Sequence, residues 1–160
     1  FGLMITESGA KVIEYNCRFG DPECQTIMPL MDKNFVDLLY KCAIGNLHKN
    51  EQIIVNNKVS ACVIATSKGY PQDYEVGYKI HLENSKYKNL QVFHSGTMIN
   101  ESKELVTNGG RVLSIVCQNK DFDSAFEKTY EYLDKVKFEG ITYRKDIGHQ
   151  VRECYQGVRN

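Results

Sequence analysis

The sequence predicts an α+β fold in which antiparallel strands are combined with a small number of helices. Two observations lead to this prediction. Residues 1–57 join an apolar strand pair to a helical pattern, whereas residues 58–150 are mostly short β-branched and aromatic runs with one long amphipathic pattern. This change of character predicts two units with a boundary near residue 57, followed by a polar tail or linker over residues 151–160.

The composition is that of a globular protein without a strongly charged surface. The 160 residues include 20 basic and 20 acidic side chains, and 42% of all residues are hydrophobic. A formal net charge of zero gives no electrostatic support for nucleic-acid binding. No apolar run reaches the length of a membrane span, and the first residues lack the features of a signal peptide, so we expect no membrane partner.

Six cysteines occur at irregular spacing, and none forms a C-x-x-C pair. We therefore expect reduced thiols in a cytoplasmic protein rather than a disulfide framework. A zinc site is not indicated, because the four histidines do not pair with cysteines at ligand spacing. The cysteines that fall within apolar patterns, where a free thiol packs like a small hydrophobic side chain, are Cys17, Cys42, Cys62 and Cys117.

The first unit is organised around residues 12–19, which β-branched and aromatic side chains predict to be a strand ended by Gly20-Asp-Pro. Because strand side chains alternate between faces, Glu14, Asn16 and Arg18 share one face. A carboxylate and an amide about 6.6 Å apart can both reach a hard cation such as Mg²⁺, and a guanidinium can hold a phosphate. The same pattern also fits a solvated outer face. The side chains expected to face an apolar core are Ile13, Tyr15, Cys17 and Phe19.

The rest of the first unit is predicted to contain a hairpin and helices. Residues 1–6 are apolar, and a turn centred on Gly9 joins them to the organising strand. A short helix is expected after that strand, and a second helical pattern runs from Asn34 to a stop at Gly45. The apolar face of this second helix comprises Phe35, Leu38, Leu39, Cys42 and Ala43.

The second unit is predicted to be mostly β structure with one main helix. Residues 122–138 carry apolar and aromatic side chains at helical spacing, and the Glu-Gly pair that follows is expected to end the helix. Asp121 or Asp123 can cap its start, whereas Ser124 with Glu127 fits a capping box that begins later. The predicted strands are residues 59–66, 78–82, 90–94, 104–107 and 111–118, with a last extended segment over 141–147.

Five sequence blocks, in order along residues 1–149, resemble glycinamide ribonucleotide synthetase (phosphoribosylamine–glycine ligase), an ATP-grasp ligase of purine synthesis. The resemblance implies that residues 1–57 are the C-terminal part of an ATP-grasp domain and that residues 58–150 are the synthetase C-terminal domain. The substrate domain and nucleotide lid would then precede residue 1, so we expect this chain alone to be inactive. The blocks are Glu14-Tyr-Asn-Cys-Arg-Phe-Gly-Asp-Pro-Glu-Cys-Gln, Ser67-Lys-Gly-Tyr-Pro, His94-Ser-Gly-Thr, Thr107-Asn-Gly-Gly-Arg-Val-Leu and Phe138-Glu-Gly-Ile-Thr-Tyr-Arg-Lys-Asp-Ile-Gly.

The resemblance also implies roles for single residues. Glu14 and Asn16 would bind Mg²⁺ or Mn²⁺, and Arg18 would be catalytic by offsetting phosphate charge. The predicted substrate-binding residues are Gly20, Asp21 and Arg111. Alternatives remain for three of the side chains: an ion pair between Arg18 and Asp21, a helix-capping role for Asp21, and a plain surface arginine after a hairpin turn at Arg111.

The implied reaction joins glycine to 5-phosphoribosylamine through glycyl phosphate, with ATP as co-substrate, in purine biosynthesis. Its products would be glycinamide ribonucleotide, ADP and phosphate. Two alternatives are another ATP-grasp carboxylate–amine ligase and a non-catalytic truncated module that only folds or docks onto a partner. Fusion to other purine-pathway enzymes would suit the polar residues 151–160.

Overall fold

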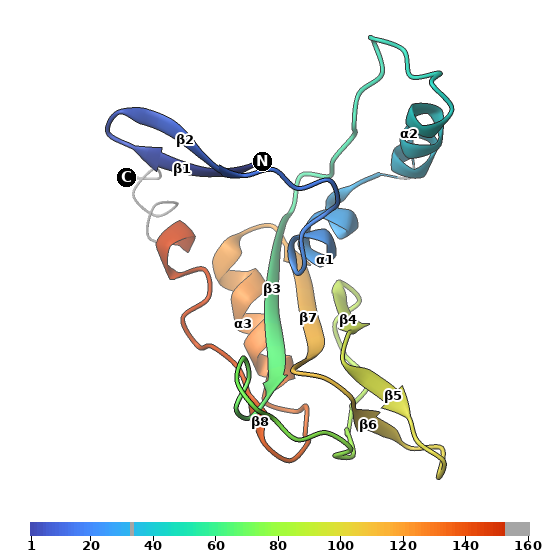
Figure 1. Ribbon diagram of the computed structural model, residues 1–160, viewed down its shortest axis with the longest axis vertical. Coiled ribbons are helices and arrows are strands. Elements are labelled where there is room, and N and C mark those ends of the chain that lie inside the picture. The colour runs from blue at the N-terminus through green and yellow to red at the C-terminus, as the bar shows by residue number, and fades with distance from the viewer. Residues whose placement is uncertain (33, 153–160) are drawn as a thin grey trace.

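The computed structural model describes residues 1–32 and 34–152 (Figure 1). Helices and antiparallel sheets are combined, which confirms the predicted mixed class. Within the described residues the strands form three antiparallel sheets, of which the largest has four strands. A hairpin and a helix lie beyond one end of this main sheet, on different sides of it (Figure 1).

The hairpin is formed by β1 (Gly2–Thr6) and β2 (Gly9–Glu14), as predicted for the N-terminal residues. Gly9 has a φ of +99°, which glycine adopts without steric cost, and its carbonyl accepts a 2.8 Å hydrogen bond from Thr6 Oγ1. β2 pairs only with β1 in the described part of the chain. The hairpin therefore has a partner along one edge of each strand only.

The predicted strand over residues 12–19 is wrong beyond Glu14, where β2 ends. Asn16 and Arg18 follow in a loop. The expected apolar face is also wrong: Ile13 is 62% and Tyr15 74% exposed. The period-2 pattern continued past the last residue that has a hydrogen-bonded partner, and the sequence carries no signal for where pairing ends.

Helical residues follow the loop as predicted. The short helix α1 (Glu23–Ile27) continues into the 3₁₀ turn η1 (Met28–Leu30), and α2 spans Asn34–Ala43. Gly45, with a φ of +70°, follows the last turn of α2, as expected for a helix stop. The predicted apolar face of α2 is only half covered: Phe35 and Leu38 are buried, whereas Leu39 and Cys42 are exposed.

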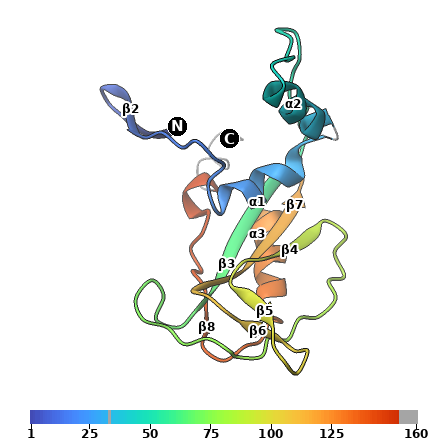
Figure 2. The ribbon, with the colours of Figure 1, turned by 45° about the vertical axis from the view of Figure 1, so that its right-hand side comes forward.

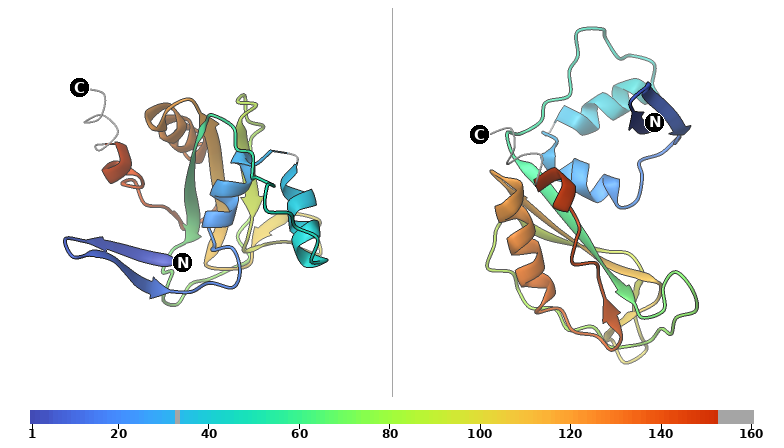
Figure 3. Two further views of the ribbon diagram at one scale, coloured as in Figure 1. Left: turned by 90° about the horizontal axis from the view of Figure 1, so that it is seen from above. Right: turned by 90° about the vertical axis from the view of Figure 1, so that its left-hand side faces the viewer.

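The main sheet has the strand order β4 (Leu90–His94), β7 (Arg111–Asn119), β3 (Val59–Ser67) and β8 (Ile141–Thr142). The helix α3 (Phe122–Leu133) covers one face, and α1 lies across the opposite face near one end (Figures 2 and 3). Cys62, whose neighbours Ala61 and Val63 are in the core, lies beside Thr26 of α1. The main sheet thus includes β8 near the C-terminus and also contacts α1, the helix that follows the N-terminal hairpin.

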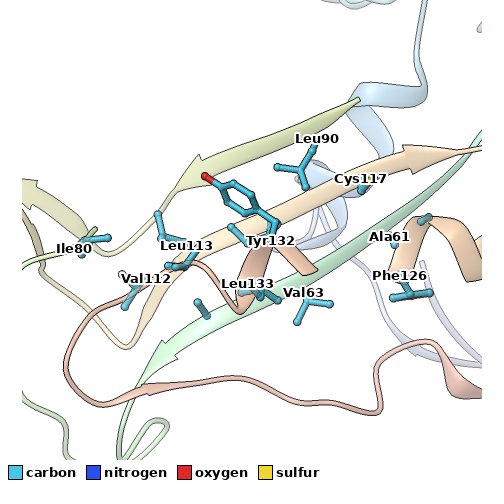
Figure 4. Packing of buried hydrophobic residues seen from close by; sticks show 14 of the residues in the cluster. Ala61, Val63, Ile80, Leu90, Val112, Leu113, Cys117, Phe126, Tyr132 and Leu133 are labelled. Atoms are coloured by element: carbon cyan, nitrogen blue, oxygen red, sulfur yellow. The ribbon is translucent and has the colours of Figure 1, made fainter. Parts of the chain in front are cut away.

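The core lies between this sheet and α3 (Figure 4). Ala61, Val63 and Ala65 of β3 are almost completely buried, and they alternate with half-buried residues on the other face. Every residue from Val112 to Cys117 in β7 is buried, as expected for a central strand covered on both faces. From α3, Phe126 and Leu133 pack against the strands (Figure 4).

The start of α3 agrees with one of the predicted caps. Asp121 accepts a 2.8 Å hydrogen bond from the backbone N–H of Ser124, so the capping box of Ser124 with Glu127 is wrong. The helix ends at Leu133, before the predicted stop. Val136 and Phe138 continue the apolar pattern, but they are buried in the irregular segment after the helix, on either side of the bridge residue Lys137, rather than on a helical face.

Three further segments of the second unit differ from the predicted strands. Residues 78–82 form only isolated bridges, Lys79 with Val106 and His81 with Lys137, instead of a strand. The last extended segment contributes only the two residues of β8. The strand β5 (Thr97–Ile99), which was not predicted, pairs with β6 (Leu105–Thr107) in a small hairpin beside the main sheet.

The described cysteines, 17, 24, 42, 62 and 117, are all free. Cys154 and residues 153–160 of the predicted tail lie outside the described residues. Among the helices that the structure describes, none is long and apolar enough to cross a bilayer.

Candidate active site

Four of the six predicted site residues line one pocket beside the start of α1. The pocket has a volume of about 340 Å³, and its polar lining comes from Glu14, Asn16, Arg18 and Glu23, next to Gly20. The side chains of Glu14, Asn16 and Arg18 line this one pocket although the three residues do not lie on a single strand. The loop after β2 brings them together instead of the strand alternation from which they were predicted.

Glu14 and Asn16 are in direct contact. The Nδ2 amide of Asn16 donates a 3.0 Å hydrogen bond to Oε1 of Glu14, so the two groups are much closer than the spacing along a strand. A carboxylate and an amide are the oxygen donors that Mg²⁺ accepts while it keeps positions for water and phosphate. The donor set therefore fits a hard divalent cation. Within residues 1–32 and 34–152, no cluster of three or more His, Cys, Asp or Glu side chains is arranged to hold a metal.

Arg18 lines the same pocket without a carboxylate partner in the described part of the chain. Its Nη1 donates a 2.9 Å hydrogen bond to the backbone carbonyl of Phe19. The alternative of an ion pair with Asp21 is wrong, because Asp21 is paired with Arg111. Most of the donors on the Arg18 guanidinium are thus free to bind an anion in the pocket.

Gly20 leaves room for the side chain of Glu23. A Cβ atom at Gly20 would lie 1.6 Å from Oε2 of Glu23, so a larger residue there would displace the carboxylate end of that side chain. The carbonyl of Gly20 also accepts a 2.9 Å hydrogen bond from the N–H of Cys24, which closes the loop onto α1. Glu23 is the first residue of α1, where an acidic side chain favours the helix N-terminus, and the same side chain also lines the pocket.

Asp21 does not cap α1. The N-cap residue of the helix is Pro22, with no side-chain capping bond, so that alternative is wrong. The Oδ1 atom of Asp21 instead accepts a 2.7 Å hydrogen bond from Nε2 of Gln25. Its Oδ2 atom lies 3.1 Å from Nη2 of Arg111.

Arg111 connects the C-terminal sheet to this loop. Besides the carboxylate contact, its Nη1 donates a 2.9 Å hydrogen bond to the backbone carbonyl of Asp21. The alternative of a plain surface arginine after a hairpin turn is therefore incomplete, because the side chain is 39% exposed but is bound to Asp21. A second hollow of about 630 Å³ begins at Pro22 and Arg111 and extends along β3 to residues 142–147.

Sequence reasoning did not assign this second hollow. Tyr70 and Arg144 line it, and both belong to the sequence blocks that carried the family resemblance, which was the available signal. Arg144 is neutralised by Asp146 through two hydrogen bonds of 2.9 and 2.7 Å. His94 is exposed, and its Nδ1 lies 3.1 Å from the hydroxyl of Thr97.

Two family models match the sequence of the chain. The sequence model described as the phosphoribosylglycinamide synthetase C domain matches residues 60–150, and that of its ATP-grasp (A) domain matches residues 1–24. The chain belongs to the phosphoribosylglycinamide synthetase family. The pocket residues Glu14, Asn16, Arg18 and Gly20 all lie within the part matched by the ATP-grasp domain of the synthetase, whereas Arg111 lies within the C domain.

Relatives of the synthetase family cover almost the whole chain. Phosphoribosylamine–glycine ligase from Caldanaerobacter subterraneus is 45% identical over 147 residues, which are 91% of this chain and 34% of that protein. The human trifunctional purine biosynthetic protein adenosine-3 is 40% identical over 160 residues, which are 99% of this chain and 16% of that protein.

A solved synthetase structure has the same fold. The crystal structure of phosphoribosylamine–glycine ligase from Thermotoga maritima matches with a TM-score of 0.78 and 34% sequence identity. The match covers 91% of this chain and 35% of that one. The chain therefore spans about a third of the length of each of these two phosphoribosylamine–glycine ligases.

Proposed function

We propose that this chain is the C-terminal part of a phosphoribosylamine–glycine ligase, in which residues 1–57 complete the ATP-grasp domain and residues 58–150 form the C-terminal domain. The observation that carries the proposal is the 45% identity to a ligase of that name over 91% of the chain. The convergence of Glu14, Asn16 and Arg18 on one pocket supports it independently.

The proposed reaction joins glycine to 5-phosphoribosylamine in two steps. The glycine carboxylate attacks the γ-phosphate of ATP, which gives glycyl phosphate and ADP. The amine of 5-phosphoribosylamine then attacks the acyl carbon, releases phosphate and gives glycinamide ribonucleotide. Both steps depend on holding the reactants in place and on stabilising negative charge, rather than on a protein nucleophile.

The pocket residues suit this division of work. Glu14 and Asn16 would hold Mg²⁺ or Mn²⁺, which when bound neutralises charge on the ATP phosphates. The guanidinium of Arg18 is the group that stabilises the negative charge of the transferring phosphoryl oxygens. Gly20 and Asp21 would supply the substrate side of the site, where the Asp21 carboxylate, already bound by Gln25 and Arg111, keeps further lone pairs for the ammonium group of glycine.

The proposal extends to the setting of the enzyme. The human relative is named trifunctional and the one from Dictyostelium discoideum bifunctional, which supports fusion of this chain to other purine-pathway enzymes in the full protein. The five described cysteines are free, which supports a reducing, cytoplasmic location.

Glu14→Gln in the full-length protein tests the assignment of the pocket. Loss of the negative charge at this oxygen ligand should lower kcat/KM for ATP by about 100-fold or more, while the protein remains folded by circular dichroism. Glu7→Gln, in the exposed turn of the same hairpin, is the matched control and should leave the rate unchanged. Turnover of Glu14→Gln at the wild-type rate with Mg²⁺ would contradict the proposed site.

A further inference from the structure

Three turns of the C-terminal domain, which contain Ser67, Gly96 and Gly109-Gly110, fix the backbone at Arg111. The N–H of Gly96 donates a 2.7 Å hydrogen bond to the carbonyl of Arg111, and the N–H of Ser67 donates a 2.8 Å bond to the carbonyl of Gly110. Ser67 Oγ adds a 2.9 Å bond to the carbonyl of Gly109. These turns belong to three of the blocks of family resemblance, in which only Arg111 was given a role from the sequence.

The turns are also packed too closely for larger residues. A Cβ atom at Gly96 would lie 2.7 Å from the carbonyl oxygen of Arg111, and one at Gly110 would lie 2.1 Å from the ring of Tyr70. Arg111 is moreover the first residue of β7, the central strand of the buried sheet. Its Cα position is therefore set by the rigid core of the C-terminal domain.

From this fixed base the side chain holds Asp21 at two points. One guanidinium nitrogen contacts the Asp21 carboxylate at 3.1 Å, and the other donates to the Asp21 backbone carbonyl at 2.9 Å. The second carboxylate oxygen is occupied by Gln25 at 2.7 Å. Both the side chain and the backbone of Asp21 are thereby oriented, with Gly20 and Glu23 of the pocket on either side of it in sequence.

We propose that Arg111 is a positioning residue, which acts through Asp21 to hold residues 20–23 against the C-terminal domain. This replaces the direct substrate contact predicted for Arg111, and it rests on the proposed ligase function. The three turns hold the backbone of Arg111 at a distance from which its guanidinium reaches both the Oδ2 atom and the backbone carbonyl of Asp21. Arg111 lines the second hollow, whereas Gly20 and Glu23, on either side of Asp21 in sequence, line the pocket of Glu14, so the ion pair joins segments that line both hollows.

A double-mutant cycle in the full-length ligase tests the proposed route through Asp21. Arg111→Met should lower kcat/KM for glycine by about 10- to 100-fold, as expected for loss of a charged hydrogen-bonded pair. If Arg111 acts through Asp21, Arg111→Met combined with Asp21→Asn is no slower than the slower single variant. Multiplication of the two single effects would show that Arg111 acts on the substrate independently and would overturn the proposal.

Hydrogen–deuterium exchange of the same proteins supplies a readout that needs no turnover. The peptide covering residues 17–25 should exchange faster in Arg111→Met than in wild type, because the N–H of Cys24 is protected by the closed loop. The control is Arg152→Met, since Arg152 is exposed to a similar extent, 41% against 39%, and also pairs with an aspartate. That variant should leave the peptide unchanged.

The two measurements separate failure of the positioning role from failure of the ligase assignment. Absence of ligase activity in the wild-type protein would count against the proposed function alone, because exchange of residues 17–25 is measured without substrates. Unchanged exchange in Arg111→Met, or an equal increase in Arg152→Met, would show that Arg111 does not hold the loop.

Discussion

Single residues of the pocket show that small side chains matter as much as charged ones. Gly20 leaves the space in which the Glu23 carboxylate approaches the backbone, so any larger residue there would displace a polar group of the pocket. Glu14 contributes a carboxylate that accepts a hydrogen bond from the amide of Asn16, and Arg18 contributes a guanidinium without a carboxylate partner in the described residues. Charge and free space together are the features of this loop on which the proposed binding of a metal-bound phosphate depends.

The thiols of the chain differ in a way that can be measured residue by residue. Burial raises the pKa of Cys62 to about 11, so at pH 8 only about 0.1% of this thiol is ionised. Cys17 is exposed. Iodoacetamide reacts with the thiolate, so in the 160-residue chain we expect Cys17 to be modified about 100-fold faster than Cys62. Peptide mass spectrometry over a time course measures both rates, and equal rates would contradict the packing of α1 on β3.

Among the elements, the three long strands of the main sheet were predicted accurately. β3, β4 and β7 agree with prediction to within one residue because one or both of their faces are covered, so their apolar pattern reports the core directly. The strand predicted over residues 12–19 has no covered face in the described chain, and there the same pattern was misleading. Whether a strand continues depends on a hydrogen-bonding partner, which a local sequence pattern does not contain.

The end of α3 shows a second limit of periodicity. The apolar stripe continues through Val136 and Phe138, and both residues are buried as the stripe indicates. The backbone nevertheless leaves the helix after Leu133, and the following irregular segment places the two side chains in the core without helical geometry. Burial was therefore predictable from the sequence, whereas the backbone conformation that achieves it was not.

The turn between β4 and β5 provides a prediction for an element rather than for a side chain. Gly96→Ala would place a Cβ atom 2.7 Å from two backbone atoms, the carbonyl oxygen of Arg111 and the Cα of Gly109. Because neither can rotate away, we expect a loss of about 1–3 kcal/mol in the free energy of unfolding. Ser95→Ala, at an exposed position in the same turn, should change the stability by less than about 0.5 kcal/mol. Urea denaturation of the full-length variants measures both values, and equal stabilities would contradict the tight packing of the turns.

At the scale of the whole molecule, the site is assembled from segments far apart in the sequence. Arg111 and Asp21 are separated by 90 positions, and their contact joins the hairpin segment to the C-terminal sheet. The sequence indicated both residues through the family resemblance, but it carried no signal that they bind each other. Long-range contacts between exposed charged residues follow from the fold as a whole, and local patterns do not report them.

The most direct test of the ligase assignment is phosphate release from ATP by the full-length protein that contains this chain. We expect rapid release only when glycine and 5-phosphoribosylamine are both present, and formation of glycinamide ribonucleotide in equal amount. Omission of either substrate should reduce the rate to background, because the acyl phosphate forms from glycine and turns over by transfer to the amine. Phosphate release that is equally fast without glycine or without 5-phosphoribosylamine would contradict the proposed function.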